Sequence, residues 1–176
     1  EGTQLEFLEI INKEADRLTR LINNLLDLSR IEAGKMQWDF QEVDLDEVLT
    51  SAAATLRVAT EKKGLALEVS HQPGMLVRGD RDKLVQVVTN LVGNAIKFTP
   101  EGGRIRLSAW KSGERHEITV EDTGLGIPEK SLGTIFQKFG RVDSSETREI
   151  KGTGLGLSIA HSIVLAHGGE LTVQSR

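Results

Sequence analysis

Two glycine-rich turns, each joined to a regular element, limit the folds open to this chain more than any other feature. The first, residues 122–127 (Asp-Thr-Gly-Leu-Gly-Ile), follows the alternating segment 116–121, which predicts a half-buried strand. The second, residues 152–157 (Gly-Thr-Gly-Leu-Gly-Leu), runs into the apolar segment 158–167, which predicts a helix. Glycine lets a backbone approach a ligand closely, and free N–H groups at a helix start attract phosphate. The turns therefore predict an α/β unit with an anion-binding site.

Neither turn fits the commoner nucleotide-binding motifs. The dinucleotide fingerprint requires a third glycine three residues after the second, but Glu129 and Ile159 occupy those positions. A P-loop requires Gly-Lys followed by Ser or Thr, and the one Gly-Lys pair, at 34–35, is followed by Met36. Any nucleotide site here therefore follows a less common design.

Composition excludes several classes of function. The 176 residues can bury a real core, and the net charge of −4 gives no electrostatic footprint for nucleic acid. The chain has no cysteine, which excludes disulfides and thiolate metal sites. The longest apolar run, residues 163–166, is too short to cross a bilayer. Without a signal peptide or an initial Met, the chain is expected to be a cytoplasmic piece of a longer protein that makes no membrane contact.

The first 35 residues predict one long helix. A capping box, Thr3 with Glu6, marks its start, and Gly34 fits the position just beyond its end. A helix of ~30 residues is about 45 Å long, which is too long for the following domain to cover. Its apolar stripe is wider than a coiled-coil seam and predicts bundle packing on a second copy or a partner helix. The stripe contains Leu8, Ile11, Ala15, Leu18, Leu21, Ile22, Leu25 and Leu28.

The remainder, residues 36–176, predicts a second domain. Asp44 and Asp80 are expected to cap helices that end near residues 63 and 98, and residues 142–151 are expected to form a mobile loop. Strands are expected at 65–70, 75–78, 104–111, 115–121 and 170–174, and further helices at 128–135 and 158–167. Because helices and strands mix without strict alternation, the pattern favours a two-layer α/β sandwich.

The helix after Asp80 carries a second group of polar residues. Asn90, Asn94 and Lys97 fall on one face, roughly a quarter turn from the apolar face. An amide oxygen is a suitable ligand for Mg²⁺, and a lysine ammonium is a point charge for phosphate. The ionised carboxylate of Asp122 in turn fits a donor such as an exocyclic amine.

Four motifs in this order resemble the catalytic half of a bacterial sensor histidine kinase. Residues 90–99 (Asn-Leu-Val-Gly-Asn-Ala-Ile-Lys-Phe-Thr) resemble the family's Asn box, and the two glycine turns resemble its glycine boxes. Residues 136–139 (Phe-Gln-Lys-Phe) match its Phe box. Residues 1–35 are similar to the second helix of the family's dimerisation hairpin. The resemblance implies the α/β sandwich shared with gyrase and heat-shock-chaperone ATPases.

The resemblance also implies ATP with Mg²⁺, and a role for each motif residue. Asp122 would accept from the adenine amino group, Asn94 would ligate Mg²⁺ beside Asn90, and Lys97 would face the phosphates. Residues 124–156 would form the ATP lid, from which Arg141 could reach the γ-phosphate. The catalytic residues would be Asn90, Asn94, Lys97 and Arg141. The nucleotide-binding residues would be Asn94, Lys97, Asp122, Gly124, Gly126, Ile127, Phe136, Phe139, Gly152, Thr153, Gly154, Leu155, Gly156 and Leu157.

Asn90 and two departures from the family pattern define the expected activity. Related ATPases have a water-activating glutamate where this chain has Asn90, which favours phosphoryl transfer to a protein over hydrolysis. The acceptor-histidine box is absent, so a histidine-bearing dimerisation helix is an expected partner. The resemblance also implies a response-regulator receiver domain and a second copy bound through residues 1–35 as partners. The last strand that usually closes the domain is also expected to be missing. The alternatives are a non-catalytic interaction module and an ATPase of the same superfamily.

Overall fold

The computed structural model describes residues 2–140 and 153–175, with the side chains of Gly2, Thr3 and Leu5 left undescribed. The chain divides into two compact units, Glu1–Met36 and Gln37–Arg176. Each unit is described by itself.

The first unit is one helix, α1 (Gly2–Glu32). Its end confirms the prediction for Gly34, which has φ +64° and donates to Ile31 O, while Lys35 N–H donates to Arg30 O. Its start differs from the prediction, because the helix already includes Thr3, so that this residue does not cap it. The expected apolar stripe is largely exposed within this unit, with Leu8 at 57%, Ile11 at 61% and Leu18 at 57%.

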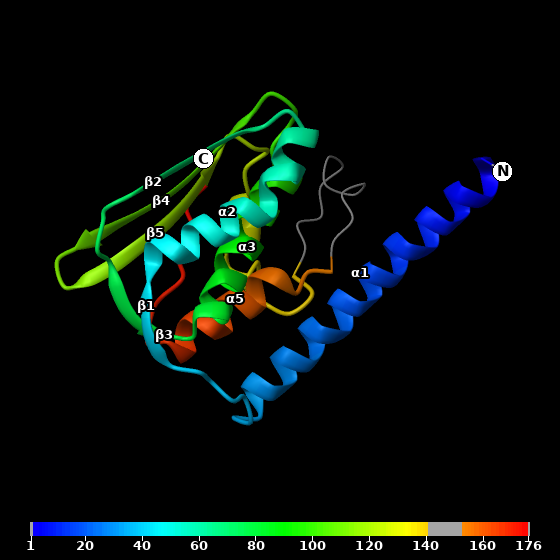
Figure 1. Ribbon diagram of the computed structural model, residues 1–176. Helices are drawn as coiled ribbons and strands as arrows, with labels where there is room; N and C mark the ends of the chain where they lie inside the picture. Colours follow the sequence, from blue (N-terminus) through cyan, green and yellow to red (C-terminus); the bar gives the residue numbers. More distant parts are fainter. Residues whose placement is uncertain (1, 141–152, 176) are drawn as a thin grey trace. The chain divides into compact units, whose positions relative to one another are not determined.

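The second unit alternates strands and helices without strict order (Figure 1). Its elements are β1 (Gln41–Asp44), α2 (Leu45–Lys62), β2 (Ala66–His71), β3 (Leu76–Gly79), α3 (Arg81–Phe98), β4 (Arg104–Ser112), β5 (Arg115–Asp122), α4 (Glu129–Leu132) and α5 (Gly156–Ala166). Among these helices and α1, none is long and apolar enough to cross a membrane.

Strand β4 is the centre of the main sheet. It runs parallel to β2 and antiparallel to β5, giving the order β2-β4-β5, and β1 pairs with β3 in a separate antiparallel ribbon. Helices α2 and α3 lie together against one face of the main sheet, and α5 packs beside α3 (Figure 1). The arrangement is the two-layer α/β sandwich that the sequence predicts.

The core forms between these two layers. Along β4, Ile105 and Leu107 are fully buried while Arg104 and Arg106 face solvent, as the alternation of side chains along a strand requires. Burying side chains of this size contributes roughly 1.5–3 kcal/mol each. The helical layer contributes fully buried Val48, Leu49, Ala52, Ile159, Ala160 and Ile163.

Side chains fix both ends of the helical layer. Asp44 Oδ1 accepts from Asp46 N at 2.9 Å, and Asp80 Oδ1 accepts from Lys83 N at 3.1 Å, so both predicted N-caps are confirmed. At the other end of α3, the Lys63 ammonium donates to the carbonyl oxygens of Ile96 (2.6 Å) and Lys97 (3.0 Å). These bonds tie the end of α2 to the last turn of α3.

One predicted strand is wrong, one predicted helix is shorter than expected, and one predicted loop lies outside the described residues. Residues 170–174 do not form the expected strand, because alternating side chains do not by themselves provide a hydrogen-bonded partner strand. The helix expected at 128–135 reduces to α4, since Gly133 ends it after one turn. The loop expected at 142–151 falls in the part of the chain that the structure does not describe.

Candidate functional site

The first glycine turn begins where β5 ends. Asp122 Oδ1 accepts from Gly124 N at 2.8 Å, which holds the carboxylate over the turn. A Cβ at Gly124 would lie 2.5 Å from that oxygen and 2.8 Å from Phe98 O, so only glycine fits there. Gly126 has φ +70°, which redirects the chain toward α4.

Helix α3 connects both glycine turns. At its C-terminal end, Phe98 O accepts from Leu125 N at 3.2 Å, joining α3 to the first turn. In its middle, Asn90 lies beside Gly156, whose Cβ would be 3.7 Å from the Asn90 amide. Residues 90 and 98 are ~12 Å apart along a helix, so the site extends along α3 from Asp122 to the start of α5.

Asn90 has an unpartnered polar atom. Its Nδ2 is buried and has no hydrogen-bond partner within the described residues. Leaving a buried donor unpaired costs about 1–3 kcal/mol, so this position is stabilised by any ligand that brings an acceptor oxygen. The first turn of α5, next to Asn90, contains no acidic residue and leaves its dipole end available to an anion.

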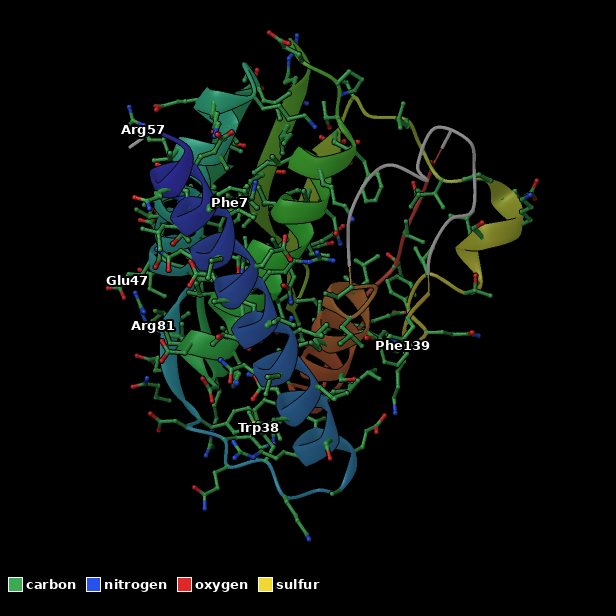
Figure 2. All side chains as sticks on the ribbon, turned by 90° about the vertical axis from the view of Figure 1, so that its right-hand side faces the viewer. Phe7, Trp38, Glu47, Arg57, Arg81 and Phe139 are labelled. Carbon is green, nitrogen blue, oxygen red and sulfur yellow. The ribbon has the colours of Figure 1, made fainter. Side chains whose placement is uncertain are left out.

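The second glycine turn packs on the Phe-box backbone. Gly154 has φ +70°, and a Cβ there would lie 2.8 Å from Phe139 Cα and 3.2 Å from Gly140 O. Phe139, labelled in Figure 2, has a positive φ of 59° and a side chain that is 61% exposed. Leu155 is fully buried and anchors the turn, and its N–H lies 3.4 Å from Thr153 Oγ1.

An aromatic stack joins the Phe box to α5. The rings of Phe136 and His161 lie 5.2 Å apart with an interplanar angle of 18°. The Phe box is therefore held at two places, by the ring of His161 and by the close approach of Gly154 to Phe139.

The remaining polar residues of α3 lie along the same helix. Asn94 and Lys97 are half-buried, and Lys97 Nζ lies 4.6 Å from the centroid of the Phe98 ring. No group of three or more His, Cys, Asp or Glu that could hold a metal ion occurs among the described residues. Asn94 remains a predicted Mg²⁺ ligand that no contact in the structure tests.

A family model resolves which design these turns and helices represent. The model described as histidine kinase-, DNA gyrase B- and HSP90-like ATPase matches residues 79–176. The chain belongs to this ATPase family. A second model, described as the His Kinase A (phospho-acceptor) domain, matches residues 1–34.

Relatives of this family member are histidine kinases. Hybrid signal transduction histidine kinase D of Dictyostelium discoideum is 40% identical over 96% of this chain. Full-length ShkA, solved in complex with AMPPNP, superposes with a TM-score of 0.79 at 27% identity over 97% of this chain. Histidine kinase ThkA, solved with the response regulator TrrA, superposes with a TM-score of 0.70 at 25% identity over 93%. The chain spans 11%, 36% and 44% of these three proteins' own chains.

The residues fit the nucleotide that the ATPase family implies. The orphaned Asn90 amide and the acid-free start of α5 suit phosphate oxygens, while the turn that holds the Asp122 carboxylate is joined to the C-terminal end of α3. Arg141 and Gly152, both predicted site residues, lie outside the described part of the chain.

Sequence reasoning missed three contacts that hold this candidate site together. They are the Phe98 carbonyl, the His161 ring and Ser175 Oγ, which accepts from Ile127 N at 2.7 Å. The Phe98 and Ser175 bonds join residues 27 and 48 positions apart, for which the sequence carries no local signal. His161 does lie in the apolar segment after the second turn, but nothing in that segment indicates its partner.

Proposed function

We propose that residues 37–176 bind ATP with Mg²⁺ and transfer its γ-phosphoryl group to a histidine that α1 lacks. We further propose that a response regulator receives the group from that histidine, and that residues 1–35 form the dimerisation helix. The observation that carries the proposal is the buried, unpartnered Asn90 amide next to the acid-free start of α5. A buried donor at a helix N-terminus is a site that an anionic ligand stabilises.

Different residues of the candidate site would contact different parts of the nucleotide along α3. Asp122 would accept from the adenine amine, while Asn90 and Lys97 would face the phosphates. Asn94 would supply an oxygen to Mg²⁺, which would neutralise charge on the phosphate oxygens when it is bound. The first turn of α5 would orient the phosphates with its backbone N–H groups.

Asn90 favours transfer to a protein over hydrolysis. Hydrolysis requires a base that removes a proton from water, and an amide cannot take up a proton at neutral pH. A histidine acceptor brings its own nucleophilic nitrogen and has no such need.

ATP as substrate also favours a cytoplasmic location, which we propose on this chemistry alone.

Binding of a fluorescent ATP analogue, with and without Mg²⁺, tests the proposal. Wild-type protein should bind the analogue and bind it more tightly when Mg²⁺ is added. Asn94→Ala should lose the Mg²⁺-dependent gain while keeping its affinity for adenosine. A chain that binds no analogue in either condition would be a non-catalytic interaction module instead. An Asn94→Ala variant that responds to Mg²⁺ like wild type would exclude Asn94 as a ligand.

A further inference from the structure

His167 occupies the C-cap of α5 and uses both ring nitrogens. Its Nε2 accepts from the backbone N–H of Asp80 at 3.0 Å, and its Nδ1 lies 2.8 Å from Ile163 O. A carbonyl oxygen can only accept, so Nδ1 carries the hydrogen. His167 thus bonds the end of α5 to the start of α3.

Asp80 joins a third segment to this junction. One carboxylate oxygen caps α3 through Lys83 N, and the other accepts from Asp39 N at 3.1 Å. Residues 38–40 are the first part of the second unit, directly after its boundary at Gln37. Asp80 is 7% exposed, so these bonds are protected from competing water.

Two aromatic side chains of this segment close around the His167 ring. Trp38, labelled in Figure 2, meets it edge-on with centroids 5.5 Å apart, and Phe40 lies 4.8 Å away. A Cβ at Gly79 would lie 3.0 Å from His167 Cδ2, so the ring is enclosed from β3 as well. Trp38, Phe40, Asp80 and His167 together are called the connector clasp below.

Helix α5 extends from the connector clasp to the candidate site. Its first residue, Gly156, is beside Asn90, and its C-terminal end lies near β1 and β3 (Figure 1). Ile159 and Ile163 are fully buried between these ends, so α5 is held firmly against the core. An 11-residue helix is ~16 Å long. The connector and the proposed phosphate end of the site are therefore attached to the same short element.

We propose that His167 is a positioning residue that fixes residues 38–40, at the start of the second unit, against α3 and α5. The freely moving part of the connection to α1 is thereby shortened, which limits the orientations available to the unit containing α1. This restraint does not rest on the proposed function. Loss of the clasp leaves the core intact but frees the connector between the two units.

Spin labels on an engineered cysteine pair test the restraint in the full chain. Because the chain contains no cysteine, Lys13→Cys on α1 and Val58→Cys on α2 label only the intended sites, and both positions are exposed. With labelled chains diluted in unlabelled protein, so that an associated pair carries one labelled copy, the wild-type chain should give a narrower distance distribution than His167→Leu. His167→Leu, which removes both hydrogen bonds, should change it to a broad one, and Trp38→Ala should do the same from the connector side. His167→Gln, which keeps an acceptor for Asp80 N–H, should restore much of the narrow distribution.

Controls separate the clasp from the fold and from the proposed function. His71→Leu, at the end of β2, should leave the distribution unchanged. Affinity for AMPPNP should change by less than about twofold in Trp38→Ala, because distant sites act independently. Equal widths in wild type, His167→Leu and Trp38→Ala would overturn the proposal. Absence of AMPPNP binding by the wild-type chain would overturn the proposed function while leaving the width comparison valid.

Discussion

Asp122 is held by its own turn before any ligand arrives. Its bond to Gly124 N orients the carboxylate, so little ordering remains to be done on binding. Asp122→Ala should weaken ATP binding about tenfold to somewhat over a hundredfold, because a hydrogen bond to a charged group contributes ~1.5–3 kcal/mol. Asp122→Asn should be comparably harmful, since an amide can present a donor to the adenine amine. Isothermal titration with ADP measures both.

The neighbouring carboxylate provides the control. Glu121 lies one residue earlier on β5, where its carboxylate is 3.5 Å from Arg106. Glu121→Ala removes the same charge and should leave ADP affinity unchanged. Unaltered affinity in both Asp122 variants would remove this residue from the site.

Gly154 is constrained both by its φ of +70° and by the Phe139 backbone. Gly154→Ala should destabilise the second unit by about 1–3 kcal/mol, because it combines an unfavourable φ with a clash against main-chain atoms. Gly133→Ala is a matched control, since Gly133 has φ −72° and nothing lies within 4 Å of its Cβ position. Urea unfolding measures both, and equal midpoints would contradict the close approach.

At the level of elements, local signals predicted most of the fold. The Asp44 and Asp80 caps, the β4–β5 hairpin and the Gly34 helix end all appear near their predicted positions. Each depends on residues within one turn or one pair of strands. Residues 170–174 show the limit of such signals, because their alternation matches a strand but pairing depends on a neighbour elsewhere in the chain.

The candidate site could be proposed from the sequence as a set of motifs, but its geometry could not. Asp122, Asn90 and the two turns were each identified from residue type and spacing. Their arrangement along α3 depends on the Phe98–Leu125 bond and on the approach of Gly156 to Asn90, which are tertiary contacts. The connector clasp is likewise invisible in the sequence, because Asp80 and His167 are 87 residues apart.

Helix α1 has an apolar stripe whose residues are largely exposed. Leu18 and Ile22 are 57% and 55% exposed, and contiguous apolar surface of this kind promotes association. The chain should therefore self-associate, and the Leu18→Asp, Ile22→Asp double variant should shift it to monomer in sedimentation equilibrium.

A matched pair on α1 tests whether the effect belongs to the stripe. Thr19 and Asn23, each one residue further along, are exposed polar positions that face about 100° away. The double substitution of these two residues by Asp should leave association intact. A wild-type chain that stays monomeric at every concentration would contradict the role proposed for α1.

At the scale of the whole molecule, the chain should bind ATP without phosphorylating itself. Its four histidines are already engaged or poorly placed: His71 pairs with Asp46 at 3.0 Å, His116 lies in β5, His161 stacks on Phe136, and His167 belongs to the clasp. Helix α1 contains no histidine. Incubation with γ-labelled ATP should therefore leave the protein unlabelled.

Restoring an acceptor completes this test. A version extended by a first hairpin helix that carries a histidine should incorporate acid-labile, alkali-stable label. The same label on the unextended chain would refute the prediction, because one of the four histidines would then be an acceptor.

The bond between Asp80 and His167 can form only late during synthesis on the ribosome, because the two residues are 87 positions apart. Translation at ~5–20 residues per second separates the emergence of these two residues by roughly 4–17 s. Until α5 follows, the start of α3 has no imidazole to accept the Asp80 N–H, and the side of α3 that α5 covers is open to solvent. The nascent chain therefore passes through an interval in which apolar surface is exposed, and a chaperone that binds such surface has those seconds in which to act.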